Sequence, residues 1–204
     1  MSCSKCGMAY VQGDTEEEAQ HAGYCDMMLN GPLVDIATDL SVIWRDGAHW
    51  ISHVTDDSPK EQRKLAHDLS RVANREMQYD GGIYHYSDPP DARVIQIFVY
   101  VVDCRANGLL LLERRKTVFG CTWPMHEGEM PSCIEHPEIP WMWSVGIIWL
   151  HPSLRGRGIA QRFLGQSLVH MGKSLEEIGW YTPFSQQGEA LVRRLCPLGF
   201  FVAK

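Results

Sequence analysis

The chain contains no hydrophobic run long enough to cross a bilayer. Its longest apolar stretch, residues 94–102, falls far short of the roughly 20 residues of a membrane-spanning helix and is interrupted by Gln96. The N-terminus, Met1-Ser2-Cys3, has no basic segment followed by an apolar one, so no secretory leader is expected. We therefore expect an intracellular protein that does not contact membranes: cytoplasmic, or nuclear if its source is eukaryotic.

Positive charge is also in short supply. The chain has 19 Lys and Arg residues against 25 Asp and Glu, which gives a formal net charge of -6. This balance excludes a general, sequence-blind attraction to nucleic acid and leaves only local basic patches, such as residues 113–116 and Arg193-Arg194, as docking points. Repeats and low-complexity segments are absent, and 45% hydrophobic with 22% charged residues is typical of a folded globular protein.

Seven cysteines, an odd number, favour metal binding or burial over a disulfide framework in a reducing compartment. Four soft ligands stand near the N-terminus as Cys3-x2-Cys6-x14-His21-x3-Cys25, within a segment that has few apolar residues to bury. Thiolates and imidazoles are preferred ligands of Zn²⁺, and four of them fill a tetrahedral structural site. We therefore predict that these four residues bind a structural Zn²⁺, which replaces a hydrophobic core; scattered buried cysteines are the alternative.

A second group of soft ligands follows no familiar zinc spacing. It comprises Cys121, His126, Cys133 and His136, in a stretch (121–140) that the prolines predict to be irregular. An ordinary loop with a packed cysteine is the favoured interpretation, and a second metal site is the alternative.

The turn cluster Asn30-Gly31-Pro32 predicts a boundary between a small module at residues 1–30 and a main domain at residues 31–204. In the main domain, Asp46-Gly47 predicts a hairpin over residues 43–51, and Ser58-Pro59 predicts the start of a helix that ends before residues 80–82. Two β-rich runs, 93–103 and 109–122, flank Asn107-Gly108, which predicts a second hairpin.

The last third of the chain alternates between strands and helices. The patterns predict a strand at 143–150, a helix at 155–172, a short strand at 178–183, a helix at 186–196 and a terminal apolar tail. The fold class is therefore α+β: a mixed, mostly antiparallel sheet flanked by helices.

A glycine- and arginine-rich loop joins the predicted strand at 143–150 to the helix after it. Its sequence is Arg155-Gly-Arg-Gly-Ile-Ala160, in which the glycines let the backbone approach a ligand closely. Backbone N–H groups and the start of the helix would converge on one point, which is suited to phosphate, and two arginines add charge. A simple connection between strand and helix is the alternative.

This loop resembles the Arg/Gln-x-x-Gly-x-Gly/Ala signature of the GNAT acetyltransferases, and Leu198-Gly199-Phe200 resembles the start of their last strand. The resemblance covers residues 90–204 and implies a GNAT-type sheet, with 31–204 as the acetyltransferase domain and acetyl-CoA as cosubstrate. It implies that a strand holds the pantetheine arm and the loop holds the pyrophosphate, through Ile148, Trp149, Leu150, Arg155, Gly156, Arg157, Gly158, Ile159 and Ala160.

A narrower resemblance extends over nearly the whole chain. The N-terminal Cys3-x2-Cys6-Gly7-Met8-x-Tyr10, acidic residues and His21-x3-Cys25 resemble the zinc finger of the sister-chromatid cohesion acetyltransferases. Those enzymes acetylate lysines of a cohesin subunit, which implies an acceptor protein with a target lysine. The chain departs from the family at Cys25, where the family has histidine, and at Thr182, where it has an aspartate implicated in catalysis.

Three residues are candidates for proton transfer or for orienting the reactants. Tyr181 and Ser185 lie near the end of the predicted strand at 178–183, where the central strands of GNAT enzymes separate, and His151 has a suitable reference pKa. Their ordinary roles would be a half-buried strand aromatic, a helix N-cap and a solvated loop residue. Glu113 is a weaker candidate for the base, because it is more often the solvent-facing member of a charged run.

Three functions are compatible with these patterns. The favoured one is a protein-lysine N-acetyltransferase with a structural zinc finger. A GNAT enzyme that acts on a small amine or a nucleic-acid base is the second, and Thr182 motivates it. The third is an inactive transferase scaffold that serves as a zinc-containing interaction module.

Overall fold

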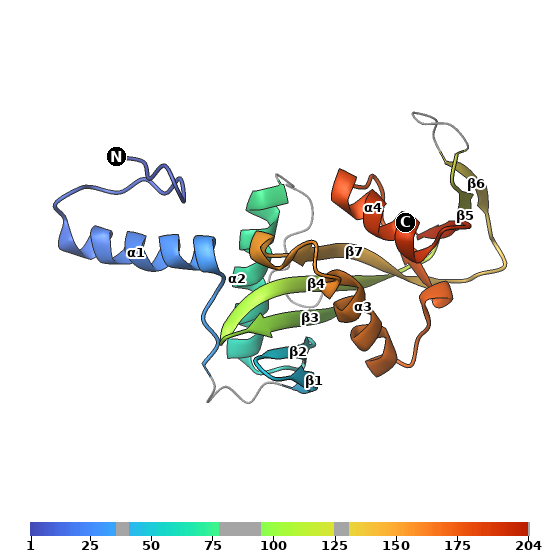
Figure 1. The fold of residues 1–204 in the computed structure, drawn as a ribbon, viewed down its shortest axis with the longest axis horizontal. Coiled ribbons are helices and arrows are strands. Elements are labelled where there is room, and N and C mark those ends of the chain that lie inside the picture. The colour runs from blue at the N-terminus through green and yellow to red at the C-terminus, as the bar shows by residue number, and fades with distance from the viewer. Residues whose placement is uncertain (36–40, 78–94, 125–130, 204) are drawn as a thin grey trace.

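A computed structural model describes residues 1–35, 41–77, 95–124 and 131–203, which form one mixed sheet with helices on both faces (Figure 1). The helices are α1 (Thr15–Asn30), α2 (Lys60–Met77), α3 (Ile159–His170) and α4 (Gln186–Leu195), with 3-10 turns at Pro152–Leu154 and Leu175–Glu177. The strands are β1 (Val42–Asp46), β2 (His49–Val54), β3 (Ile95–Val102), β4 (Arg105–Arg115), β5 (Val118–Thr122), β6 (Ser132–Glu135), β7 (Met142–Leu150), β8 (Ile178–Trp180) and β9 (Phe200–Ala203).

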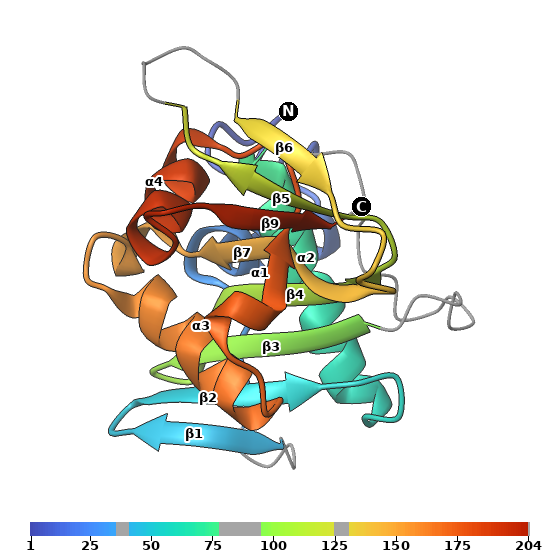
Figure 2. The same cartoon turned by 90° about the vertical axis from the view of Figure 1, so that its right-hand side faces the viewer.

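The nine strands lie in the order β1-β2-β3-β4-β7-β8-β9-β5-β6. Among the strands that the structure describes, only the pairs β7–β8 and β8–β9 are parallel, so the predicted mixed, mostly antiparallel α+β sheet is confirmed. Figure 2 shows α3 and α4 on one face of the sheet and α2 behind it. None of the described helices is both long enough and apolar enough to cross a membrane.

Alternating side chains of the central strands divide the core into two layers. Phe98, Tyr100 and Leu110 pack with Phe163 and Leu164 of α3 on one face. The residues between them, such as Val99 and Leu109, point to the other face, where they pack with Leu69 and Val72 of α2. Period-two alternation on β3 and β4 thus gives each helix layer its own apolar surface.

The predicted hairpin at 43–51 is confirmed, because β1 and β2 pair across a turn in which Gly47 has φ +58°. The second predicted hairpin is present, but the prediction that its turn lies at Asn107-Gly108 is wrong. The chain turns instead at Asp103 and Cys104, whose φ angles of 49° and 60° suit a type I′ turn. Asn107-Gly108 lies inside β4, where Asn107 is the extra residue of a bulge opposite Tyr100 and Val101.

The stretch predicted to be irregular, 121–140, contains β6, which pairs with β5. Cys121 and Cys133 face each other across these strands and form a disulfide, which contradicts the expectation that the cysteines are unpaired. The bond also removes two ligands from the alternative second metal site, while His136 contacts Glu138 at 2.6 Å. His126, residues 80–82 and Arg93 lie outside the described residues.

Gly108 marks a point where β4 packs too closely to admit a side chain. A Cβ at this position would lie 2.7 Å from Leu150 Cδ2 and 2.8 Å from Tyr100 Cβ. We expect Gly108→Ala to lower the free energy of unfolding by about 1–3 kcal/mol, since overpacking forces neighbours out of place. Urea denaturation measures this change.

The matched control is Gly165→Ala, at an exposed position of α3 where an added Cβ meets nothing within 4 Å. Because alanine favours helix over glycine, this variant should gain roughly 0.5–1 kcal/mol. Equal stability of the two variants would contradict the close packing at Gly108.

Candidate functional site

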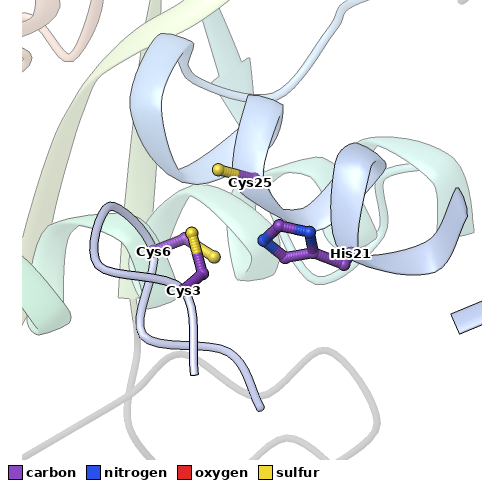
Figure 3. A group of neighbouring side chains, drawn as sticks. All are labelled: Cys3, Cys6, His21 and Cys25. Atoms are coloured by element: carbon purple, nitrogen blue, oxygen red, sulfur yellow. The ribbon is translucent and has the colours of Figure 1, made fainter. Parts of the chain in front are cut away.

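The N-terminal module is built around a helix that has no buried residue. Asp14 caps α1 by accepting the N–H groups of Glu16 and Glu17, and His21 and Cys25 lie one turn apart on the helix face that meets the preceding loop. In that loop, Gly7 has φ +66° and donates its N–H to the carbonyl of Cys3. Figure 3 shows the side chains from loop and helix pointing toward one another.

The four predicted metal ligands meet in one cluster. One ligand atom from each of Cys3, Cys6, His21 and Cys25 lies within 4.8 Å of the others, and Cys6 is 1% exposed. The Nε2 atom of His21 is buried without a hydrogen-bond partner, although the ring is stacked on Tyr10 at 4.0 Å. A buried polar atom without a partner is costly, and a Zn²⁺ among these atoms would satisfy it, so the residues fit the metal.

The thiols of the cluster differ in their acidity. Hydrogen bonds from the backbone of Cys6 and Lys5 lower the pKa of the Cys3 thiol to about 6, whereas desolvation raises the pKa of the Cys25 thiol to about 11. A metal binds the thiolate form, so binding would release the proton of the Cys25 thiol.

The module is docked on the sheet through polar contacts. Arg105 of β4 donates to Asp26 at 2.7 Å and to the carbonyl of Gly31 at 3.0 Å, and the first of these bonds lowers the pKa of Asp26. His151 Nε2 lies 2.8 Å from the carbonyl oxygen of Leu29, and Met27 packs against the α2-side core. The end of α1 is therefore fixed to the ends of β4 and β7, and the division at residues 30–31 stays a prediction.

The second site forms where two central strands separate. β8 pairs with β7 at three positions, the last of which is Val145 opposite Trp180; the N–H of Tyr181 then donates to the Val145 carbonyl at 3.0 Å. Gly146 lies in a bulge, and beyond it β7 pairs only with β4 among the described residues. A cavity of about 650 Å³ lies along this free edge of β7, between the start of α3 and one side of α4.

The loop at residues 155–160 forms the end of this cavity. Gly156 and Gly158 both have φ +73°, and an added Cβ at either would meet nothing within 4 Å, so the backbone there is open to a ligand. Gly158 is the N-cap of α3 and no side chain caps the helix, which leaves its first N–H groups directed at the cavity. An uncapped helix start attracts anions.

The structure brings eight of the nine predicted cofactor residues into the cavity wall: Ile148, Trp149, Leu150, Arg155, Gly156, Gly158, Ile159 and Ala160. Arg157 stands between two of them, exposed and without an ion pair to any described residue. Arg155 differs, because its guanidinium is held by Glu76 and by the carbonyl of Leu150. Sequence reasoning missed Glu76, which no motif marks.

The three proton-transfer candidates occupy different places. Ser185 lines the cavity, and its hydroxyl accepts the N–H of Gly188 at 3.1 Å as the N-cap of α4. Tyr181 is 36% exposed just beyond β8, with the Arg115 guanidinium 5.4 Å from its ring centre. His151 does not line the cavity, and its ring nitrogens contact Ser153 and the Leu29 carbonyl.

The charged run around Glu113 favours a solvent-facing side chain, but the structure does not place it there. It is 8% exposed, pairs with Arg115 and lies opposite Ser144 in the β4–β7 ladder, one position before Val145. A buried carboxylate therefore stands on the α2 side of the sheet beside the point where β7 and β8 separate. Glu113, Arg115 and Tyr181 form one polar group at this point.

Comparisons with known proteins bear on the N-terminal module and on the fold. Residues 1–27 match the family model described as the zinc-finger of acetyl-transferase ESCO. The chain is 22% identical over 216 residues to N-acetyltransferase ECO1 of Candida glabrata, which covers 93% of this chain and 81% of that protein.

Two solved structures share the fold. The xEco2 acetyltransferase domain bound to a CoA conjugate matches with a TM-score of 0.65 and 20% identity, covering 81% of this chain and 98% of that chain. The same domain alone matches with a TM-score of 0.64 and 19% identity, covering 82% and 97%. The resemblance stated from the motifs is thus confirmed: the chain combines an ESCO-type zinc finger with the fold of a GNAT acetyltransferase.

Proposed function

We propose that the chain is an acetyl-CoA-dependent N-acetyltransferase whose acceptor is a lysine amine of a protein. The observation that carries the proposal is the cavity that runs along the free edge of β7 to the uncapped start of α3. The unpaired backbone of β7 along this cavity can bind an extended pantetheine arm. The N-terminus of α3, which carries a partial positive charge, can bind a pyrophosphate. A CoA conjugate is bound by the xEco2 domain, which has the same fold.

In this proposal the chain's residues divide the work of holding acetyl-CoA. The N–H and C=O groups of Ile148, Trp149 and Leu150 bind the pantetheine amides. The N–H groups of residues 156–160 bind the pyrophosphate, with the exposed Arg157 as the counter-charge. Bound acetyl-CoA supplies an activated acetyl thioester at the point where β7 and β8 separate.

The acceptor amine must lose a proton before it attacks. A lysine ammonium has a reference pKa of about 10.4, so it needs a base or a desolvated channel. We assign this role to Glu113, because it is buried and lies opposite Ser144, one position before the strands separate at Val145. The amine nitrogen would then bond to the acetyl carbon as the carbon–sulfur bond breaks, and the Tyr181 hydroxyl would protonate the leaving thiolate.

A small-amine or nucleic-acid-base acceptor is the second candidate. The specific observation in its favour is Thr182, which has no ionisable group where the cohesion enzymes have aspartate. Glu113 weakens this argument, since it supplies a carboxylate from a different strand. A zinc-containing scaffold without activity is the third, and it requires that the cavity bind no CoA.

An assay with three acceptor pools distinguishes these functions. We expect label from acetyl-CoA to appear on lysines of a protein pool and not on polyamine or nucleic-acid pools, while calorimetry shows that CoA binds. Label confined to the non-protein pools would overturn the lysine acceptor. Absence of CoA binding at millimolar ligand would overturn the transferase itself.

Replacing the proposed base gives the second test. Glu113→Gln should lower kcat by about 10²–10⁴-fold, the usual contribution of a general base, and leave the Kd of CoA within about twofold. The control is Glu135→Gln, on the exposed strand β6. A kcat that changes no more than in the control variant would exclude Glu113 as the base.

We also propose that Cys3, Cys6, His21 and Cys25 hold one structural Zn²⁺. Elemental analysis of the purified chain should give one zinc per molecule, and His21→Ala should lower this content and the melting temperature. His136→Ala is the control, because His136 lies in the rejected second cluster. Equal zinc content in both variants and the wild type would rule out the N-terminal site.

A further inference from the structure

Glu76, in the last turn of α2, joins a distant helix to the proposed cofactor site. Its Oε2 atom accepts a hydrogen bond from Trp149 Nε1 at 2.6 Å and another from the Arg155 guanidinium at 2.5 Å. Arg155 in turn donates its Nε–H to the carbonyl of Leu150 at 2.8 Å. All four residues line the same cavity, and they come from α2, from the end of β7 and from the loop.

The carboxylate of Glu76 is ionised at neutral pH. Its partial burial raises the pKa, but the hydrogen bonds from Arg155 and Trp149 outweigh this effect and hold the pKa below its usual value. Both contacts are therefore charge-assisted, which makes them stronger and more directional than neutral hydrogen bonds.

Arg155 immediately precedes the two glycines of the loop. Gly156 and Gly158 have no side chains to restrict them, so the loop's geometry depends on how its first residue is anchored. Glu76 fixes the Arg155 side chain, and Arg155 fixes the carbonyl at the end of β7. The distance between the free edge of β7 and the start of α3 is thereby set from α2.

We propose that Glu76 is a positioning residue, which acts through Arg155 to hold the loop in the shape that binds the pyrophosphate of acetyl-CoA. The inference rests on the proposed function. In this proposal Arg155 holds the loop in place, whereas Arg157 and the N–H groups at the start of α3 bind the negatively charged phosphates.

The sign of the Coulomb interaction makes this inference testable. Glu76 carries a negative charge beside a site for a negative ligand, so electrostatics alone predicts that its removal tightens CoA binding. Positioning predicts the opposite, because the loop loses its anchor and must be ordered when the ligand binds.

Calorimetry with CoA should therefore show weaker binding, by about tenfold or more, for Glu76→Ala and a smaller loss for Glu76→Gln, which still accepts from Trp149. The KM for acetyl-CoA should rise in parallel while kcat at saturation changes little, since the interaction is equal in the ground and transition states. A merely structural defect would instead lower the active fraction and hence kcat. If Glu76→Ala fails to fold, Glu76→Gln decides alone.

Two comparisons complete the test. Glu189→Gln removes an exposed Glu–Arg pair of α4 outside this cavity and should leave CoA binding unchanged. The double variant Glu76→Ala/Arg155→Ala should bind CoA no more weakly than Arg155→Ala, because the first residue acts through the second.

The outcomes separate the two proposals. If wild-type protein does not bind CoA, the proposed function fails. If wild-type binds and Glu76→Ala binds as tightly or more tightly, the positioning role is wrong while the function stands. Additive losses in the double variant would also overturn action through Arg155.

Discussion

The separation of β7 from β8 after Val145 is the constraint on which the second site depends. Parallel strands that stayed paired would consume the N–H and C=O groups of residues 146–150 in the sheet, and no extended ligand could bind them. The bulge at Gly146 bends β7 at this point, and α3 begins after the 3-10 turn at Pro152–Leu154 and the glycine loop. The free backbone edge of β7 and the start of α3 therefore line the same cavity. The backbone forms this cavity, and the side chains adjust its shape.

The same constraint explains which parts of the site the sequence predicts. The loop at 155–160 can be predicted from the sequence because its glycines and arginines are adjacent. The structure places all of the predicted cofactor residues except Arg157 in the wall of one cavity. The role of Glu76 cannot be predicted from the sequence, because a glutamate near the end of an amphipathic helix is common. Its partners are 73 and 79 residues away, and only the fold brings them together.

The errors in the predicted fold have physical reasons as well. Asn107-Gly108 has the composition of a tight turn, but the glycine is needed where β4 meets Tyr100 and Leu150. Asp103 and Cys104 make the turn in its place, although cysteine is unusual at positive φ. The Cys121–Cys133 pair was missed because composition suggests reduced thiols, whereas strand pairing sets the two side chains face to face.

The N-terminal module shows how a segment without a core is held in place. Its helix has no fully buried residue, yet the backbone bonds around Gly7 and the cap at Asp14 bring four ligand atoms to one point. The proposed Zn²⁺ would satisfy His21 Nε2, which is buried without a hydrogen-bond partner. Beyond the cluster, Arg105, Met27 and the Leu29 carbonyl make contacts that join the module to the rest of the chain.

The contacts of the N-terminal module reach the proposed acetyl-CoA site through α2 and His151. His151 was a candidate base, but its contacts with Leu29 and Ser153 make it the residue that ties the module to the loop after β7. Glu76 ties the same loop to α2, and Arg75, its neighbour in sequence, lies beside Gly7 of the module. The segment from His151 to Arg155 is thus held from the module and from α2 at once. If acetyl-CoA binds where we propose, the order of its phosphate loop depends on residues far from the reacting atoms.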